Sequence, residues 1–423
     1  IATNSPRYGN THLPDLTAAT PVFRDGRIVA YVASICHLSD IGGTSEGAFA
    51  QDAFEEGFCL PPVKLVEAGV PNALVRRILA ANVRVPAQVL GDVDALIAAN
   101  ALGERRVTAL LDSDAGLDLD EAAAHICDAT ERAVRASIAE IPDGHYAASI
   151  DLDGFEEPKT IVVSVEVHGD SMTVDYEGTS RQSTFGINSA SPTFGYTRYG
   201  LACLLAPELP NNEGALRPIA IRVPEGSLLN PRTNAAVSAN FPAHAIPSVL
   251  SRALADVLPD RVSAAAGTPF WVVGIRGEKE TGPFASLLCF NGGQGAARGQ
   301  AGYATLSTPS NVSNTPVEIV ESQAPVLVES KSIVRGSGGE GAWRGGDGQE
   351  VALVSRHDAP LDVIFLTERI EHAAPGLAGG GDGAPGVLRV DGSDVAEPKG
   401  RIRWAPGSRI LMRTPGGGGY GAR

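Results

Sequence analysis

Two short segments near the start of the chain carry side chains that can bind a metal. His12 and Asp15 stand three residues apart, and His37 and Asp40 repeat that spacing. Imidazole and carboxylate are the ligands that a divalent ion such as Zn, Mn or Fe takes when one position must stay open for water or substrate. The pattern therefore predicts a metal site for chemistry on a small molecule. Ordinary loop side chains that cap turns are the alternative interpretation.

The residues between the two segments predict the element that positions them. Residues 16–23 and 28–36 are apolar and β-branched, and Asp25-Gly26 lies in the turn between them. This pattern is typical of a β-hairpin, and pairing of its strands would bring the two segments side by side. The pair Gly42-Gly43 would let the backbone come close to a ligand.

Composition and charge narrow the classes of function. The chain has 423 residues, of which 43% are hydrophobic and 20% charged, as expected for a globular protein of two or three domains. The net charge of -15 opposes binding to a phosphate backbone, so no nucleic-acid partner is expected. The longest apolar runs, such as 201–206, fall short of a membrane span, so no membrane association is expected.

The five cysteines indicate a reducing compartment. They are widely spaced, odd in number and form no Cys-x-x-Cys pair, so we expect buried reduced thiols in a cytoplasmic protein. The first residue is Ile rather than Met, so residues are expected upstream and a leader sequence stays open.

The hydrophobic period predicts a mixed fold. Residues 70–141 have helical spacing, interrupted at Pro86 and Gly116, whereas residues 160–178 alternate as a hairpin that turns at Gly169-Asp170. Further helices are expected over 192–206 and 246–257, and short strands with glycine-rich turns after 260. We therefore predict an α+β fold: a large, mixed, β-rich chain with a helical insertion near residues 70–141.

These changes of period divide the chain into four segments, with their packing as one intertwined unit left open. They are a β-rich metal-binding segment (1–69), a helical segment (70–145), an α+β segment (146–260) and a β-rich, glycine-rich segment (261–423). The glycine-rich residues 336–348 are interpreted as packed turns, because they lack the Gly-x-x-x-x-Gly-Lys-Ser/Thr pattern of a phosphate-binding loop.

Ten stretches, taken together, resemble the B-type subunit of hydantoinases and 5-oxoprolinases. They span nearly the whole chain: 11–23, 28–43, 60–69, 80–100, 175–188, 209–231, 313–322, 336–348, 366–380 and 414–421. The resemblance implies a larger, actin-like A-type partner subunit that binds ATP and Mg. It also implies further residues at both ends of the chain.

The resemblance implies an enzyme that opens a cyclic amide. In the hydrolases of this family, ATP phosphorylates the amide oxygen of a hydantoin, 5-oxoproline or another lactam, and water then attacks the ring. We therefore expect the metal-binding subunit of an ATP-dependent cyclic-amide hydrolase. Two alternatives stay open: a subunit of an ATP-dependent carboxylase of the acetone or acetophenone type, and a non-catalytic scaffold for an ATPase partner. The exact substrate, the metal and the stoichiometry are not predicted.

The resemblance also suggests roles for particular residues. In the acetone carboxylase branch the metal ligands match His12, Asp15 and His37, and one divalent ion (Zn, Mn or Fe) is expected there. The catalytic candidates are Asp40, as a group that orients a ligand or water, together with Glu56 and His244. Substrate binding is assigned to Asn188, Asn212 and Glu213.

Each of these roles has an ordinary structural alternative. Glu56 could belong to a solvated acidic pair with Glu55, Asn212-Glu213-Gly214 is a good turn, and His244 is more typical of a core histidine. The chain also departs from the usual family pattern: Ser5 stands where an Asp is common, and the residues around His244 replace a more polar segment. An atypical substrate is therefore expected.

Overall fold

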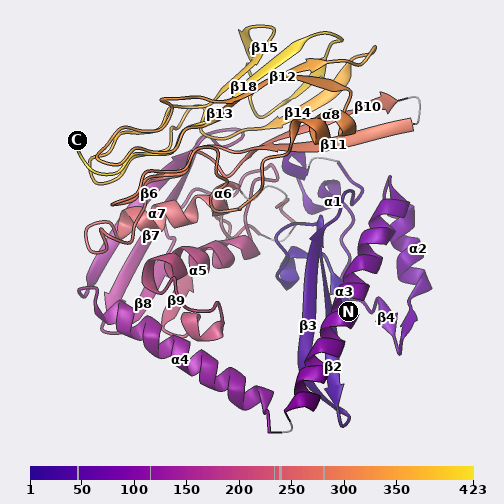
Figure 1. The fold of residues 1–423 in the computed structure, drawn as a ribbon, viewed down its shortest axis with the longest axis vertical. Helices are drawn as coiled ribbons and strands as arrows, with labels where there is room; N and C mark the ends of the chain where they lie inside the picture. Colours follow the sequence, from indigo (N-terminus) through magenta and orange to yellow (C-terminus); the bar gives the residue numbers. More distant parts are fainter. Residues whose placement is uncertain (45–46, 115, 233, 238–240, 280–281) are drawn as a thin grey trace. The chain divides into compact units, whose positions relative to one another are not determined.

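The computed structural model describes residues 1–44, 47–114, 116–232, 234–237, 241–279 and 282–423. Over this part the chain forms helices and several separate sheets, which confirms the predicted mixed fold (Figure 1). Two compact units can be distinguished, each built from separate stretches of chain: one from 1–137, 181–195 and 208–240, the other from 138–180, 196–207 and 241–423. The four consecutive segments expected above stay a prediction.

The helices lie close to where the hydrophobic period places them. Residues 70–141 contain three long helices, and the predicted helix over 192–206 also forms. The α-helices are α1 (Ala53–Glu56), α2 (Ala73–Asn82), α3 (Pro86–Ser113), α4 (Leu119–Ala139), α5 (Ser191–Leu205), α6 (Phe241–His244), α7 (Ile246–Ala253) and α8 (Val317–Gln323), and the 3-10 helices are η1 (Pro6–Tyr8), η2 (Gly47–Phe49) and η3 (Glu213–Leu216).

The strands include both hairpins that the sequence predicts. They are β1 (Ala2–Thr3), β2 (Asp15–Arg24), β3 (Arg27–His37), β4 (Val66–Glu67), β5 (Val70–Pro71), β6 (Gly144–Leu152), β7 (Lys159–His168), β8 (Ser171–Asp175), β9 (Ile219–Arg222), β10 (Trp271–Lys279), β11 (Gly282–Phe290), β12 (Val326–Ile333), β13 (Gln349–Ser355), β14 (Leu361–Leu366), β15 (Val387–Val390), β16 (Ser393–Asp394), β17 (Arg401–Trp404) and β18 (Arg409–Arg413).

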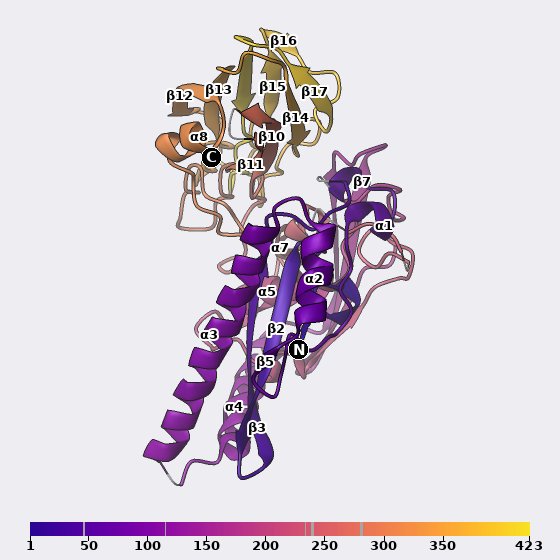
Figure 2. The same ribbon diagram turned by 90° about the vertical axis from the view of Figure 1, so that its right-hand side faces the viewer.

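The first unit is organised around the β2–β3 hairpin. Strand β2 lies between β1 and β3, and helix α3 packs along both hairpin strands (Figure 2). Alternate residues of β2, Leu16 and Ala18, are buried among apolar side chains of α2 and α3 such as Leu79 and Val93. Because side chains alternate along a strand, Asp15 and Thr17 lie on the opposite face, away from this core.

The second unit contains a β-sandwich. One sheet has the order β11-β10-β14-β17 and the other β12-β13-β18-β15-β16. Their inner faces share one apolar core that includes Trp271, Phe365 and Trp404 from the first sheet, and Leu353 and Met412 from the second. The strands β6, β7 and β8 of this unit pair as an antiparallel meander, and α7 packs on β6 and β7.

Glycine-rich segments of the second unit pack backbone against backbone. The amide of Gly417 donates to the carbonyl of Gly346, and the carbonyl of Gly417 accepts from Gly339. A methyl group on Gly345 would lie 1.9 Å from the carbonyl oxygen of Gly417, and one on Gly293 equally close to that of Gly346. Residues 336–348, expected above as packed turns, therefore pack against neighbouring backbone at distances that only glycine allows.

The cysteines correct one expectation and support another. None of the five is in a disulfide, as predicted. However, the expectation that they are buried is wrong, because Cys59 and Cys203 are exposed and the other three are half-buried. In the described part of the chain, no helix is both long and apolar enough to cross a membrane.

The backbone packing predicts opposite effects of two glycine-to-alanine changes. Gly345→Ala would force apart two segments that touch, so we expect the free energy of unfolding to fall by about 3 kcal/mol. Gly91→Ala, in α3, meets nothing within 4 Å and should stabilise the protein by about 0.5–1 kcal/mol. Urea denaturation measures both, and equal stability of Gly345→Ala and wild type would contradict the close packing.

Candidate metal centre

The register of the β2–β3 hairpin places two of the predicted ligands opposite each other. Asp15 is the first residue of β2 and pairs with His37, the last residue of β3. His12 lies in the turn just before β2, where its carbonyl accepts a hydrogen bond from the amide of Asp15 at 3.1 Å. Three side chains from two stretches of sequence therefore converge at one end of the hairpin.

The geometry of this cluster suits a single ion. One nitrogen or oxygen of each of His12, Asp15 and His37 lies within 4.8 Å of the other two. The Nε2 atom of His12 is 3.4 Å from Oδ1 of Asp15, and the two imidazole rings are tilted by 59° with centroids 4.9 Å apart. Since Zn–N and Zn–O bonds are about 2.0–2.2 Å long, only a small inward movement would let all three reach one ion.

The surroundings favour the protonation states that bind metals. Although His37 reaches solvent, burial is the largest effect that lowers the pKa of its imidazole, followed by the charge of His12. Burial alone would raise the pKa of the Asp15 carboxyl, but hydrogen bonds from His12 and Thr11 and the charges of the two histidines outweigh it and hold that pKa below its usual value. A neutral imidazole and an ionised carboxylate are the forms that coordinate metals.

A buried polar frame holds the loop that carries His12. Asn4, which is fully buried, donates from Nδ2 to the carbonyls of Leu13 (2.8 Å) and Phe58 (2.9 Å). Asn10, 1% exposed, donates to the carbonyl of Thr3 at 2.8 Å and accepts a short hydrogen bond from Thr17. The sequence analysis gave neither asparagine a role; their only signal is their place beside His12.

Glu56 belongs to the same frame. Its carboxylate is 2% exposed, and its two oxygens accept hydrogen bonds from the amides of Leu13 (3.3 Å) and Val237 (2.8 Å). Burial raises the pKa of this carboxyl, and the two backbone amides and the charge of His12 partly offset that effect. The catalytic role predicted for Glu56 stays a prediction, whereas its contacts give it a positioning role for the loop that carries His12.

Asp40 is placed apart from the three ligands. Its carboxylate pairs with the guanidinium of Arg84 at 2.7 Å and accepts hydrogen bonds from the amides of Gly42 and Arg84. Within the described residues, none of its hydrogen bonds reaches His12, Asp15 or His37. The repeated His-x-x-Asp spacing therefore contributes three side chains to the cluster, and Asp40 bonds to residues that follow β3. The catalytic role predicted for Asp40 stays a prediction.

The predicted substrate residues lie in tightly bonded loops. Asn188 is fully buried, and its side chain bonds to the backbone of Ser183, Phe185 and Ala236. Asn212 caps η3 and donates to Thr130 of α4 at 2.8 Å, next to the exposed Glu213. Substrate binding by these residues stays a prediction.

His244 lies in an aromatic cluster of the second unit. Its ring is 5.0 Å from that of Tyr196, 5.9 Å from Phe270 and 6.2 Å from Phe241, in edge-on arrangements. The half-buried side chain therefore packs as part of an aromatic cluster, as a structural histidine does. Its catalytic role stays a prediction.

Comparison with known proteins gives the family. The sequence profile described as hydantoinase B/oxoprolinase matches residues 1–423. The chain is 33% identical to the B subunit of a putative D-/L-hydantoinase of Pseudomonas sp. (strain NS671), covering 100% of this chain and 75% of that protein. It is 32% identical to 5-oxoprolinase of Dictyostelium discoideum, of which it spans 34%.

Two solved structures share the fold. The ATP-dependent caprolactamase of Pseudomonas jessenii superposes with a TM-score of 0.89 at 27% identity, covering 100% of this chain and 77% of that one. A nucleotide-free acetone carboxylase superposes with a TM-score of 0.86 at 17% identity, covering 99% of this chain and 64% of that one, which shows likeness of fold alone.

The two hydrogen bonds accepted by Glu56 predict a stability effect. Glu56→Gln would turn one acceptor into an amide donor that faces a backbone N–H, so we expect the free energy of unfolding to fall by about 1–3 kcal/mol. The matched control is Glu55→Gln on the exposed neighbour, which should change it by less than about 0.5 kcal/mol. Identical urea midpoints for the two variants would rule out the positioning role.

Proposed function

Because the chain belongs to the hydantoinase B/oxoprolinase family, we propose that it is the metal-binding subunit of an ATP-dependent enzyme that hydrolyses a cyclic amide. The observation that carries the proposal is the convergence of His12, Asp15 and His37 at one end of the β2–β3 hairpin. Relatives named as a 5-oxoprolinase and as the beta subunit of a caprolactamase support a lactam as the substrate class.

The donor set fits a single divalent ion of the Zn, Mn or Fe type. Two imidazoles and one carboxylate leave coordination positions for water and substrate, as in hydrolytic metal sites. The lowered pKa values of His37 and Asp15 favour their metal-binding forms. A bound ion of this kind would lower the pKa of a coordinated water and polarise a substrate oxygen.

The remaining residues of the centre have supporting tasks in this proposal. His12, Asp15 and His37 hold the ion, while Asn4 and Glu56 fix the loop on which His12 stands. The overall reaction consumes ATP and water: the amide C–N bond of the ring is broken, and ADP and phosphate are released. This chain would supply the centre at which water reaches the activated amide.

ATP binding, with Mg, is assigned to an actin-like A-type partner subunit. Relatives whose names mark them as one subunit of a larger enzyme, the hydantoinase and the caprolactamase chains, support a hetero-oligomer. In this chain the glycine-rich residues 336–348 pack against other backbone segments, as at Gly345, and this supports a structural role for them. The unpaired cysteines support a reducing, cytoplasmic location.

Metal content is the first test of the proposal. Elemental mass spectrometry on the purified complex should find about one divalent ion per chain, and His12→Ala and His37→Ala should lose both the ion and ATP-coupled turnover. His125→Ala, an exposed histidine on α4, is the control and should retain both. A wild-type protein without metal, combined with full turnover in the two ligand variants, would leave the scaffold interpretation in its place.

The requirement for a co-substrate tests the reaction class. ATP hydrolysis by the complex should rise at least ten-fold on adding a lactam (hydantoin, 5-oxoproline or caprolactam) and should not require bicarbonate. Dependence on bicarbonate together with a ketone such as acetone would instead assign the complex to the carboxylases. Steady-state release of phosphate, measured with and without each compound, distinguishes the two.

A further inference from the structure

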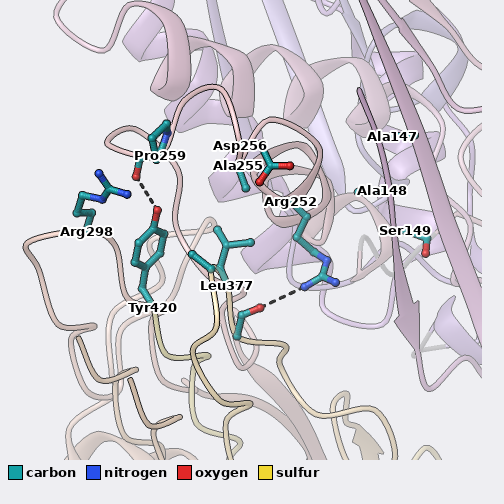
Figure 3. Close-up of a pocket in the computed structure, with 12 residues that line it drawn as sticks. Ala147, Ala148, Ser149, Arg252, Ala255, Asp256, Pro259, Arg298, Leu377 and Tyr420 are labelled. Carbon is teal, nitrogen blue, oxygen red and sulfur yellow. Dashed lines mark hydrogen bonds between the residues drawn. The ribbon is translucent and has the colours of Figure 1, made fainter. Parts of the chain in front are cut away.

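A groove of about 660 Å³ in the second unit lies along one edge of strand β6 (Figure 3). Ala147, Ala148 and Ser149, three consecutive residues of β6, all line it. Since consecutive side chains point to opposite faces of a sheet, a groove that touches all three runs along the edge of the strand rather than over a face. The other lining residues come from three later stretches: Arg252, Ala255, Asp256 and Pro259; Arg298; and Gly376, Leu377, Ala378 and Tyr420.

The register of the sheet shows which backbone groups point into this groove. The amide and carbonyl of Val162 in β7 both bond to the Thr179 hydroxyl, and those of Thr160 to Ser180, on the side of β7 away from β6. In an antiparallel pair the direction alternates, so Val163 faces β6 and bonds with its partner Ala148. Ala147 and Ser149 therefore direct their N–H and C=O groups outward, to the edge.

Only some of these outward N–H and C=O groups of β6 lack a hydrogen bond within the described residues. Asp151 follows in the same alternation, and its carbonyl accepts a hydrogen bond from the guanidinium of Arg369 at 2.8 Å. In the described part of the chain, no hydrogen bond joins the outward N–H or C=O of Ala147 or Ser149 to another residue. The groove thus offers two donors and two acceptors in a row, at the spacing of a β-ladder.

Arg252 adds a positive charge to the groove. It reaches into the groove from α7 and donates from Nη1 to the carbonyl of Gly376 at 3.2 Å. Arg298 is paired with Asp260 at 3.1 Å, and Asp256 also lines the groove. The charges favour a bound segment with one carboxylate, which would pair with Arg252. Several acidic residues in a row would be repelled by Asp256 and Asp260.

We propose that this groove binds an extended polypeptide segment of the partner subunit, which adds to β6 as a further strand and places one carboxylate on Arg252. The carbonyls of Ala147 and Ser149 require N–H donors, which a peptide backbone has and a small inorganic anion lacks. The small side chains of Ala147, Ser149, Ala255 and Ala378 leave room for a backbone to approach. The proposal rests on the partner chain of the proposed function, but not on the metal centre.

Hydrogen exchange on the wild-type proteins is the primary test. The amides of Ala147 and Ser149 should exchange at least ten-fold more slowly in the complex with the A-type partner than in the isolated chain. The amide of Ala148, which already bonds to β7, should change little. This comparison needs no substitution, so it holds even where a variant fails to fold.

A pair of variants at one position separates the backbone from the side chain. Ser149→Pro removes the outward N–H but keeps Ala148 in the extended region that a residue before proline prefers, so β6 should form and partner affinity should fall at least ten-fold. Ser149→Ala keeps the N–H and should bind like wild type. Arg252→Gln should weaken binding of the partner, as measured by the Kd in biolayer interferometry.

Three outcomes would overturn the proposal. A complex that forms without protection of Ala147 and Ser149, and with equal affinity for both Ser149 variants, places the partner elsewhere and leaves the proposed function standing. Phosphate can be added to the isolated chain at about 10–50 mM, enough to fill a weak site of millimolar affinity. If phosphate then protects these amides, the groove is an anion site. If no complex with the A-type partner forms, the groove has no partner strand to bind and the proposal fails. The metal content of the chain then tests the proposed metal centre independently.

Discussion

The pairing of Asp15 with His37 across the β2–β3 hairpin is the constraint on which the candidate centre depends. Side chains alternate along a strand, so a slip by one residue would turn Leu16 or Cys36 to the face that now carries Asp15 and His37. The burial of Leu16 and Ala18 against α3 opposes such a slip, because it would expose both to water. Burial of the apolar face of the hairpin thus fixes which side chains lie on its polar face.

The clustering of three side chains could be predicted because these residues are local in sequence. His12 and Asp15 are three residues apart, and His37 is brought to them by a hairpin that the Asp25-Gly26 turn indicates. The helices over 70–141 were predicted for the same reason, since a period of 3.6 is visible within a short window. Each of these features needs only neighbouring residues for its recognition.

The supporting contacts could not be predicted because their partners are distant in sequence. Asp40 forms an ion pair with Arg84, 44 residues later in the sequence. Glu56 accepts a hydrogen bond from the amide of Val237, 181 residues later. A carboxylate in a sequence carries no mark of which backbone amide it will meet. The second His-x-x-Asp element therefore looks like a duplicate of the first, although its Asp forms an ion pair with Arg84.

The glycine-rich segments that pack backbone against backbone in the second unit constrain when this part of the chain can fold during synthesis. The segment around Gly417 touches backbone near Gln294, Gly339 and Gly346, and its neighbour Gly418 donates to the carbonyl of Ala265. All these segments lie far upstream, and contacts between distant segments form slowly. This packing can be completed only after residues 414–421 have left the ribosome. Until then the earlier glycine segments lack the neighbour around Gly417 that packs between them.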